Sequence, residues 1–153
     1  MIRPTVRTDT PALVAIAEKT QVFKPHELVA LREVLDDFHD EPGEHHAYTL
    51  ETNEKIMGFV YFAPTAMTDR TWHLYWIFVD KNTQAKGLGT RLLHFAEAKI
   101  KEAGGRLLLI ETSGLPYYQL TRAFYLKHGY DLDATLHDYY EDGDNMNVFR
   151  KRL

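Results

Sequence analysis

The sequence contains no cysteine, which excludes several kinds of site at once. Without thiols the chain can form no disulfide framework, no thiolate metal site and no cysteine nucleophile. This absence fits a reducing compartment, and we expect the protein in the cytoplasm. Basic residues are not in excess either, since the net charge is -4 and the pI is about 6.0. Because no global positive field attracts a phosphate backbone, we do not expect nucleic acid as a partner.

Long apolar runs, repeats and low-complexity linkers are missing as well. No stretch reaches the ~18 uninterrupted apolar residues of a membrane helix, and the first residues lack the charged-then-apolar order of a signal peptide. We therefore expect no membrane span. At 153 residues and 44% hydrophobic content the chain suits one compact domain, and we assign residues 1–153 to it.

The eight histidines show no metal-binding pattern. An H-E-x-x-H motif is absent, and His45 and His46 stand in an expected turn without suitably spaced carboxylates. We expect no structural or catalytic metal.

What the sequence does contain is an alternation of strand-like and helix-like patterns. Residues 87–103 carry apolar side chains at helical spacing, and residues 106–112 form a continuous apolar run typical of a central strand. The expected order is β-α-α-β-β-β-α-β-α-β-β, a mixed sheet with helices on its faces. The other strands are expected at residues 2–7, 46–52, 55–64, 73–80, 130–136 and 145–153. The other helices are expected to begin after Thr8 or Asp9 and after Pro25, and to span residues 117–127. A turn-rich segment is expected at residues 137–145.

Two glycines, Gly87 and Gly89, open the helix that follows the strand at residues 73–80. Unpaired N–H groups and the positive end of the helix dipole meet at such a point, and residues without side chains let a phosphate approach the backbone. The alternative is a tight strand-to-helix turn without a ligand. A dinucleotide fingerprint would need a third glycine where Leu92 stands, and the Lys-Ser/Thr pair of a P-loop is absent.

These segments resemble the GNAT superfamily of acyl-CoA N-acyltransferases. Its signature is a strand ending in Val-x-Pro and then Gln/Arg-x-x-Gly-x-Gly/Ala at the start of a long helix; "VDKNTQAKGLG" matches, with Lys81 in place of the proline. "ETSGLPYYQLTRAFYLKHGY" is similar to the family's second conserved region, and Gly58 matches a glycine common in its third strand. The resemblance covers nearly the whole chain and implies an α/β (α+β) fold with a mixed, mostly antiparallel sheet and helices on both faces.

By this resemblance, the pyrophosphate of the coenzyme lies on the glycine turn, and its pantetheine arm pairs like an extra strand with the preceding strand. Many relatives carry an asparagine seven residues before the catalytic tyrosine; Tyr118 stands there, and we expect it to pack over the coenzyme arm. Lys86 and Arg91 can add positive charge, although Arg91 equally fits a solvated helix start. The implied pyrophosphate positions are Gln84, Ala85, Lys86, Gly87, Leu88, Gly89 and Thr90, and the implied pantetheine positions are Ile77, Phe78 and Val79.

Acetyl transfer to an amine needs a base, because an alkylamine is mostly protonated near pH 7, and an acid for the leaving thiolate. The resemblance assigns the acid to Tyr125 of the FY-x-x-x-G-Y motif; alternatively, Tyr125 and Phe124 are simply core aromatics. By family analogy, a backbone N–H near Phe78 or Val79 stabilises the oxyanion.

Glu111 is the candidate base, because it ends the apolar run "LLLIE", where partial burial favours a proton-accepting carboxylate. Alternatively, its carboxylate is hydrogen-bonded to Thr112, to Ser113 or to the N–H groups of the next helix. His73 and Tyr75 on the neighbouring strand are other candidates for the base.

The resemblance also implies an acceptor site between the first helical pair and the last hairpin, and both segments are acidic here. Such a mouth can attract an amine or a peptide N-terminus, although solvated acidic loops explain the same pattern. The residues concerned are Asp36, Asp37, Asp40, Glu41 and Glu44 in the first segment, and Asp138, Glu141, Asp142 and Asp144 beside Tyr139 and Tyr140 in the second.

The sequence therefore predicts an N-acetyltransferase that uses acetyl-CoA as its acyl-donor cosubstrate. The acceptor is a primary amine, namely a small amine, an amino acid or a peptide N-terminus, which attacks directly in a ternary complex. The alternative is a catalytically silent acyl-CoA-binding sensor or interaction module. A nucleotide-binding domain of unrelated type is a third reading, and a homodimer is compatible with each.

Overall fold

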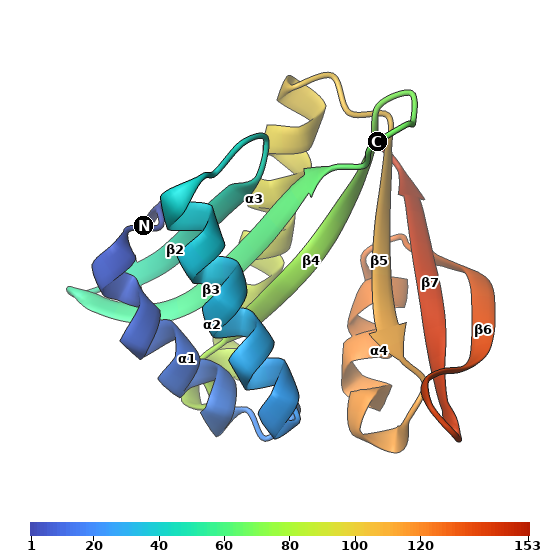
Figure 1. Ribbon diagram of the computed structural model, residues 1–153, viewed down its shortest axis with the longest axis horizontal. Coiled ribbons are helices and arrows are strands. Elements are labelled where there is room, and N and C mark those ends of the chain that lie inside the picture. Colours follow the sequence, from blue (N-terminus) through green and yellow to red (C-terminus); the bar gives the residue numbers. More distant parts are fainter.

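The computed structural model describes residues 1–153, except for the side chains of Gln84 and Ala85. Its strands form one seven-stranded sheet in the order β1-β2-β3-β4-β5-β7-β6 (Figure 1). Neighbouring strands are antiparallel except for the parallel pair β4 and β5. The predicted element order and the mixed, mostly antiparallel sheet are thus confirmed. The strands are β1 (Ile2–Pro4), β2 (His46–Thr52), β3 (Lys55–Pro64), β4 (Thr71–Val79), β5 (Leu107–Ser113), β6 (Asp131–Glu141) and β7 (Asp144–Arg152).

Helices cover both faces of the sheet (Figure 1). They are α1 (Thr10–Lys19), α2 (Pro25–Asp40), α3 (Leu88–Glu102) and α4 (Gln119–Lys127). One buried cluster joins Leu13 of α1 and Leu31 of α2 to Phe59 of β3, and a second joins Leu92 of α3 to Tyr125 of α4. Fully burying a side chain such as Leu92 contributes about 1.5–3 kcal/mol, so the apolar faces expected from helical spacing hold the layers together.

Gly58 allows α3 to pack closely against β3. A Cβ atom at this position would lie 2.9 Å from Leu92 Cδ1 and 3.0 Å from the carbonyl oxygen of Phe78. Neither neighbour has room to move far, because both are buried. The glycine therefore brings the helix that begins at the glycine turn close to the middle of the sheet.

The parallel pairing of β4 and β5 is short. It runs from Thr71 beside Leu107 to Leu74 beside Ile110. Beyond that point the two strands diverge, and the sheet opens into a V (Figure 1). A bulge occurs at the same place, since β3 pairs with Trp76 and then with Leu74, which leaves Tyr75 as the extra residue of β4.

Some boundaries differ from the sequence expectations. The segment at residues 137–145, expected to be turn-rich, is mostly strand, because β6 continues to Glu141 with a register shift after Leu136. The Asn145 side chain accepts a hydrogen bond from the Asp138 amide at 3.0 Å, and this local bond bridges the shift. A short 3-10 helix at Lys81–Lys86 precedes α3, and another at Pro116–Tyr118 precedes α4.

Within the part of the chain that the structure describes, none of the helices has the length and apolar character needed to cross a membrane.

Candidate active site

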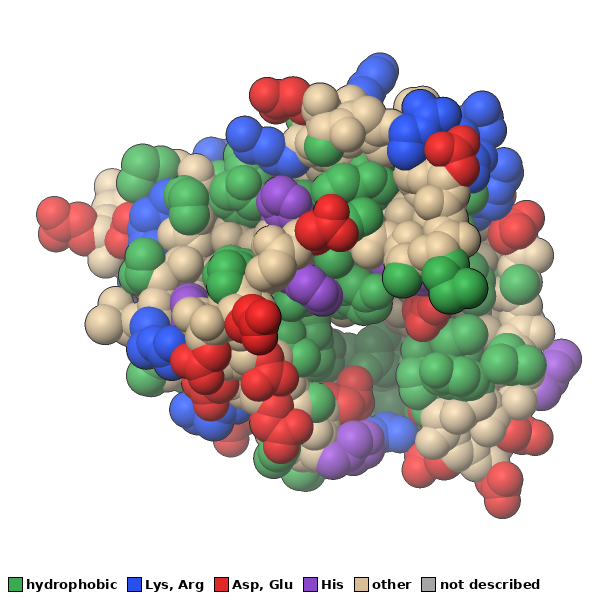
Figure 2. All heavy atoms as spheres, turned by 45° about the horizontal axis from the view of Figure 1, so that its top comes forward, with side chains coloured by type: hydrophobic (Ala, Val, Ile, Leu, Met, Phe, Trp, Pro, Cys, Tyr) green, Lys and Arg blue, Asp and Glu red, His purple; other side chains and the backbone are tan. Residues whose placement is uncertain are grey.

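A cavity of about 820 Å³ lies where β4 and β5 separate. Its walls come from residues 74–79 of β4, residues 110–113 of β5, the connection between α1 and α2, the first turn of α3, helix α4 and the β6–β7 hairpin. Figure 2 shows the hollow, with hydrophobic side chains inside it and acidic side chains around it. Segments that are distant in sequence meet here, as is usual for a ligand site.

The glycine turn forms one end of this cavity. Gly87 is the N-cap of α3 in the left-handed conformation (φ 72°), and the first intrahelical bond runs from Arg91 N–H to the Gly87 carbonyl at 3.1 Å. The N–H groups of Leu88, Gly89 and Thr90 therefore have no carbonyl acceptor within the helix. A Cβ atom at Gly87 would meet nothing within 4 Å, so the turn is open on its outer side.

The predicted cradle residues are only partly gathered at this turn. Gly87, Gly89 and Thr90 line the cavity. Leu88 is buried in the core at 8% exposure, so that only its backbone is available to a ligand. Lys86 is exposed at the end of the 3-10 helix, and the predicted contacts of Gln84 and Ala85 lie outside the described side chains.

The end of β4 forms the wall next to the turn. Ile77, Phe78 and Val79 all line the cavity, and on one edge they pair with residues 58–60 of β3. On the other edge the pairing with β5 has already ended at Leu74. Because the Phe78 and Val79 side chains are themselves buried, the backbone edge of β4 is the part that an extended ligand can pair with.

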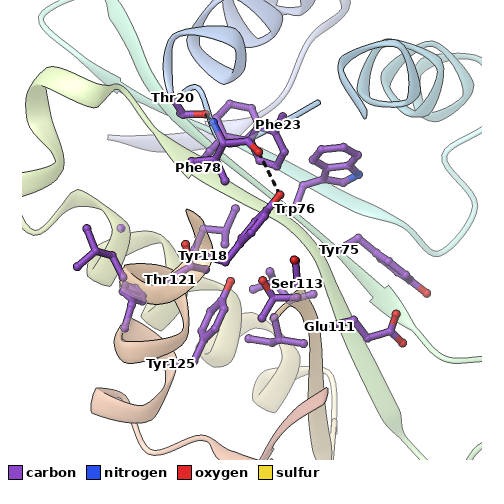
Figure 3. A pocket seen from close by; sticks show the side chains of 18 of the residues that line it. Thr20, Phe23, Tyr75, Trp76, Phe78, Glu111, Ser113, Tyr118, Thr121 and Tyr125 are labelled. Carbon is purple, nitrogen blue, oxygen red and sulfur yellow. Dashed lines mark hydrogen bonds between the residues drawn. The ribbon is translucent and has the colours of Figure 1, made fainter. Parts of the chain in front are cut away.

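Tyr125 places a hydroxyl group deep in the cavity. Its side chain is 4% exposed and packs against Tyr130 and Phe149, yet the hydroxyl points into the open space (Figure 3). The ring is therefore part of the core, while the hydroxyl faces the cavity; the acid role of Tyr125 stays a prediction. Burial alone raises the pKa of Tyr125, and no hydrogen bond to a described group contributes. The phenol is thus protonated at neutral pH and is suited to donate a proton.

Glu111 stands at the first position of β5 after the parallel pairing ends, and it lines the same cavity. Its side chain is 39% exposed, and Oε1 lies 3.3 Å from Nε2 of His73. The alternative bond to Ser113 does not form, because the Ser113 hydroxyl donates to Asp144 instead. Tyr75 lies beside Glu111 (Figure 3), and burial, followed by the Glu111 charge, raises the pKa of Tyr75.

Two contacts cross the cavity that the sequence did not indicate. The Tyr118 hydroxyl donates to the Val22 carbonyl oxygen at 3.2 Å, so this side chain spans the opening (Figure 3). The Lys24 ammonium donates to Glu141 at 2.9 Å and to Asp144 at 3.3 Å. Both contacts tie the α1–α2 connection to the opposite arm of the V.

The acidic mouth is smaller than predicted. Of the acidic residues expected from the two segments, Glu141 and Asp144 line the cavity, and Glu27 joins them from the first turn of α2. The first segment, residues 36–44, lies elsewhere, and its Asp40 forms an ion pair with Arg7 at 2.7 Å. Among the described side chains, no group of three or more His, Cys, Asp or Glu is placed to hold a metal ion.

The chain is similar to a known protein family and to solved structures. The model of the family described as "Acetyltransferase (GNAT) family" matches residues 12–130. No curated protein matches the sequence. A crystal structure from Desulfovibrio desulfuricans, assigned to the GNAT family as an acetyltransferase, superposes with a TM-score of 0.94 at 31% identity, over 99% of this chain and 98% of that one.

More distant structures show the same fold. The ribosomal-protein-S18-alanine N-acetyltransferase of Escherichia coli has a TM-score of 0.81 at 19% identity, over 100% of this chain and 93% of that one. The PaiA N-acetyltransferase of Thermoplasma acidophilum, solved in complex with coenzyme A, has a TM-score of 0.77 at 16% identity, over 100% and 98%. Since the family match covers most of the sequence and the structural match nearly all of it, the chain belongs to the GNAT family of acetyltransferases.

Proposed function

We propose that the protein transfers the acetyl group of acetyl-CoA to a primary amine, which attacks directly in a ternary complex. One observation carries the proposal: the glycine turn, the unpaired edge of β4 and the Tyr125 hydroxyl all face one cavity. The turn suits a diphosphate, the strand edge suits an amide-bearing arm, and the hydroxyl suits a leaving thiolate. The absence of cysteine agrees with direct attack, since no thiol can carry the acetyl group.

The coenzyme fits this arrangement from the turn inwards. The amides of the segment from Gln84 to Thr90 would hold the pyrophosphate, and the open space at Gly87 leaves room for it. The pantetheine arm would then pair with the edge of β4 at Ile77, Phe78 and Val79. Tyr118 would pack over this arm from the opposite wall, which is consistent with its position across the cavity.

The reaction needs a base and an acid, and the site offers a group for each role. Glu111 takes one proton from the acceptor's ammonium, and the neutral nitrogen then attacks the thioester carbon. A β4 amide near Phe78 or Val79 stabilises the oxyanion that forms. Tyr125 donates its proton to the departing thiolate and recovers one from the nitrogen of the new amide, so one proton leaves through Glu111 per turnover.

The acceptor would enter between the α1–α2 connection and the β6–β7 hairpin. Of the carboxylates that line this end of the cavity, Glu141 and Asp144 are already paired with Lys24, so Glu27 and Glu111 are the ones whose charges favour a cation over an anion. Aromatic walls such as Trp76 add faces that attract an ammonium group. A small amine, an amino acid with an exposed amine or a peptide N-terminus is therefore the expected class.

A panel of amines, amino acids and short peptides, assayed with acetyl-CoA for free thiol release, tests the proposal. Release that depends on one class of amine is the expected result. Coenzyme A that raises the melting temperature without any release would favour the silent sensor instead. Stabilisation by ATP or NAD, but not by coenzyme A, would refute both and point to a nucleotide-binding domain.

A further inference from the structure

His73 lies next to Glu111 but outside the cavity. It is opposite Leu109 on β5, and Glu111, two residues further along, points to the same face because side chains alternate along a strand. The two side chains approach to 3.3 Å, between His73 Nε2 and Glu111 Oε1. Glu111 lines the cavity whereas His73 does not, so His73 can act on an acceptor through Glu111 rather than by direct contact.

The imidazole of His73 is held in place by Thr65 at its other nitrogen, Nδ1, and by the ring of Tyr75. Nδ1 lies 2.6 Å from the Thr65 hydroxyl, just beyond the end of β3. The Thr65 backbone is fixed in turn, because its N–H donates to the Thr71 carbonyl at 2.7 Å and its carbonyl accepts from the Thr68 hydroxyl at 2.8 Å. The Tyr75 ring stacks on the imidazole, with centroids 5.5 Å apart and planes 18° apart. The His73 side chain is 15% exposed and has little freedom to turn.

We propose that His73 is a positioning residue for Glu111, and that the Thr65 hydroxyl sets the His73 tautomer that performs this role. The inference rests on the proposed function, in which Glu111 accepts the proton of the amine. When Thr65 donates to Nδ1, the ring proton sits on Nε2 and faces the carboxylate. The opposite tautomer would turn a lone pair toward the negative oxygen, so the Thr65 hydroxyl and the Glu111 charge select the same state.

Glu111 needs such a partner because its side chain is long and 39% exposed. A solvated carboxylate divides its time among several rotamers, whereas a base must stay within hydrogen-bond reach of the proton that it removes. A misplacement of about 1 Å can lower a rate by ~100-fold. His73, which is fixed at Nδ1 and by Tyr75, limits the carboxylate to positions near Nε2.

Matched variants test this role in an active wild-type protein. His73→Leu and Thr65→Val should lower kcat by about 10- to 100-fold with the KM for acetyl-CoA unchanged, since neither residue lines the cavity. His73→Gln keeps an N–H donor and Thr65→Ser keeps the hydroxyl, so both should retain most of the activity. In a Glu111→Gln background, His73→Leu should cause no further loss, because the two act on one step.

These outcomes separate the inference from the function on which it rests. If the wild-type protein acetylates an amine and His73→Leu matches its kcat, only the positioning role is overturned. Equal losses in His73→Gln and His73→Leu would also overturn it, because packing rather than hydrogen bonding would then explain both. Thiol release with no amine at all would instead refute the proposed function.

A measurement that needs no catalytic turnover tests which nitrogen of His73 carries the proton that faces Glu111. Nitrogen-15 spectra of the histidine rings in the free protein should show His73 with its proton on Nε2, and the Thr65→Val protein should lose this preference. A ring proton on Nδ1 in the wild-type protein would overturn the inference whatever the activity.

Discussion

Removing the Tyr125 hydroxyl should separate catalysis from stability. In the wild-type protein the side chain is 4% exposed, and its hydroxyl has no partner among the described groups. Burying a hydroxyl without a partner costs roughly 1–3 kcal/mol in mutational data. Because this hydroxyl faces a cavity that water can enter, only part of that cost applies. We expect Tyr125→Phe to leave the free energy of unfolding unchanged or to raise it by up to about 1 kcal/mol.

The kcat of the same variant should fall steeply. Loss of a general acid lowers a rate by about 10²- to 10⁴-fold, which corresponds to about 3–5 kcal/mol of transition-state stabilisation. The KM for acetyl-CoA should change little, since the phenylalanine ring keeps the packing of Tyr125 against Tyr130 and Phe149. A protein that is at least as stable as the wild type, yet nearly inactive, cannot owe its inactivity to misfolding.

Tyr130→Phe is the matched control. Tyr130 is 2% exposed, its ring centroid lies 5.8 Å from that of Tyr125, and its hydroxyl donates to Glu97 at 2.7 Å. Deleting this hydroxyl removes a bond to a carboxylate, so the free energy of unfolding should fall by about 1–3 kcal/mol while kcat is retained. Urea unfolding and thiol release measure the two quantities. Wild-type kcat in Tyr125→Phe, or a loss of stability equal to that of Tyr130→Phe, would refute the reasoning.

Three further predictions concern the turn, the opening and the pH dependence. Gly87→Ala and Gly104→Ala both put a side chain at positive φ in open space, each at a cost of about 1–2 kcal/mol, but only Gly87 lines the cavity. The Kd for coenzyme A, measured by calorimetry, should therefore rise only for Gly87→Ala, and equal affinities would contradict the pyrophosphate site. Tyr118→Phe removes the bond to the Val22 carbonyl, so hydrogen exchange in the α1–α2 connection should become faster; unchanged exchange would mean that this bond does not hold the connection. Burial lowers the pKa of His46, so the unfolded chain binds its proton more readily, and stability that is present above the unfolded pKa of about 6.5 should be lost as the pH falls below it. Urea unfolding should show a smaller loss between about pH 7.5 and 5.5 in His46→Phe, and an equal loss would exclude His46 as a source.

The helices and strands that form the layers of the fold were predictable because each produces its own spacing of apolar residues within a short stretch of sequence. Leu92, Ala96 and Ile100 recur at helical spacing, and all three are fully buried in the structure. The hairpin at residues 137–145 was harder, because Asp138 and Gly143 are turn-forming residues by composition. In the structure Asp138 has positive φ (56°) and its carboxylate accepts from the Gly143 amide, so one residue bends a strand that otherwise continues. Composition alone does not separate a bent strand from a loop.

Residues of the site could be predicted from the sequence only where they belong to a recognisable sequence motif. Gly87 and Tyr125 are far apart in sequence, and the resemblance placed both at one site; both line the cavity. The bond from Tyr118 to Val22 joins residues 96 positions apart, and no local pattern signals it. Lys24, the N-cap residue of α2, and Glu27 in its first turn were missed for the same reason. The way α2 packs on the sheet, rather than its charge pattern, decides which residues at its start face the cavity.

The position of the opening follows from two features that coincide on β4. Leu74 is the last residue that pairs with β5, and Tyr75, the next residue, is the bulge. A bulge bends its strand and increases its twist, so β4 turns away at the residue where β5 leaves it. His73 therefore stays in the paired, rigid part of the sheet, while Glu111 is the first residue of β5 on the open side. This geometry gives the solvent-accessible carboxylate of Glu111 a fixed neighbour, as the role proposed for it as a base requires.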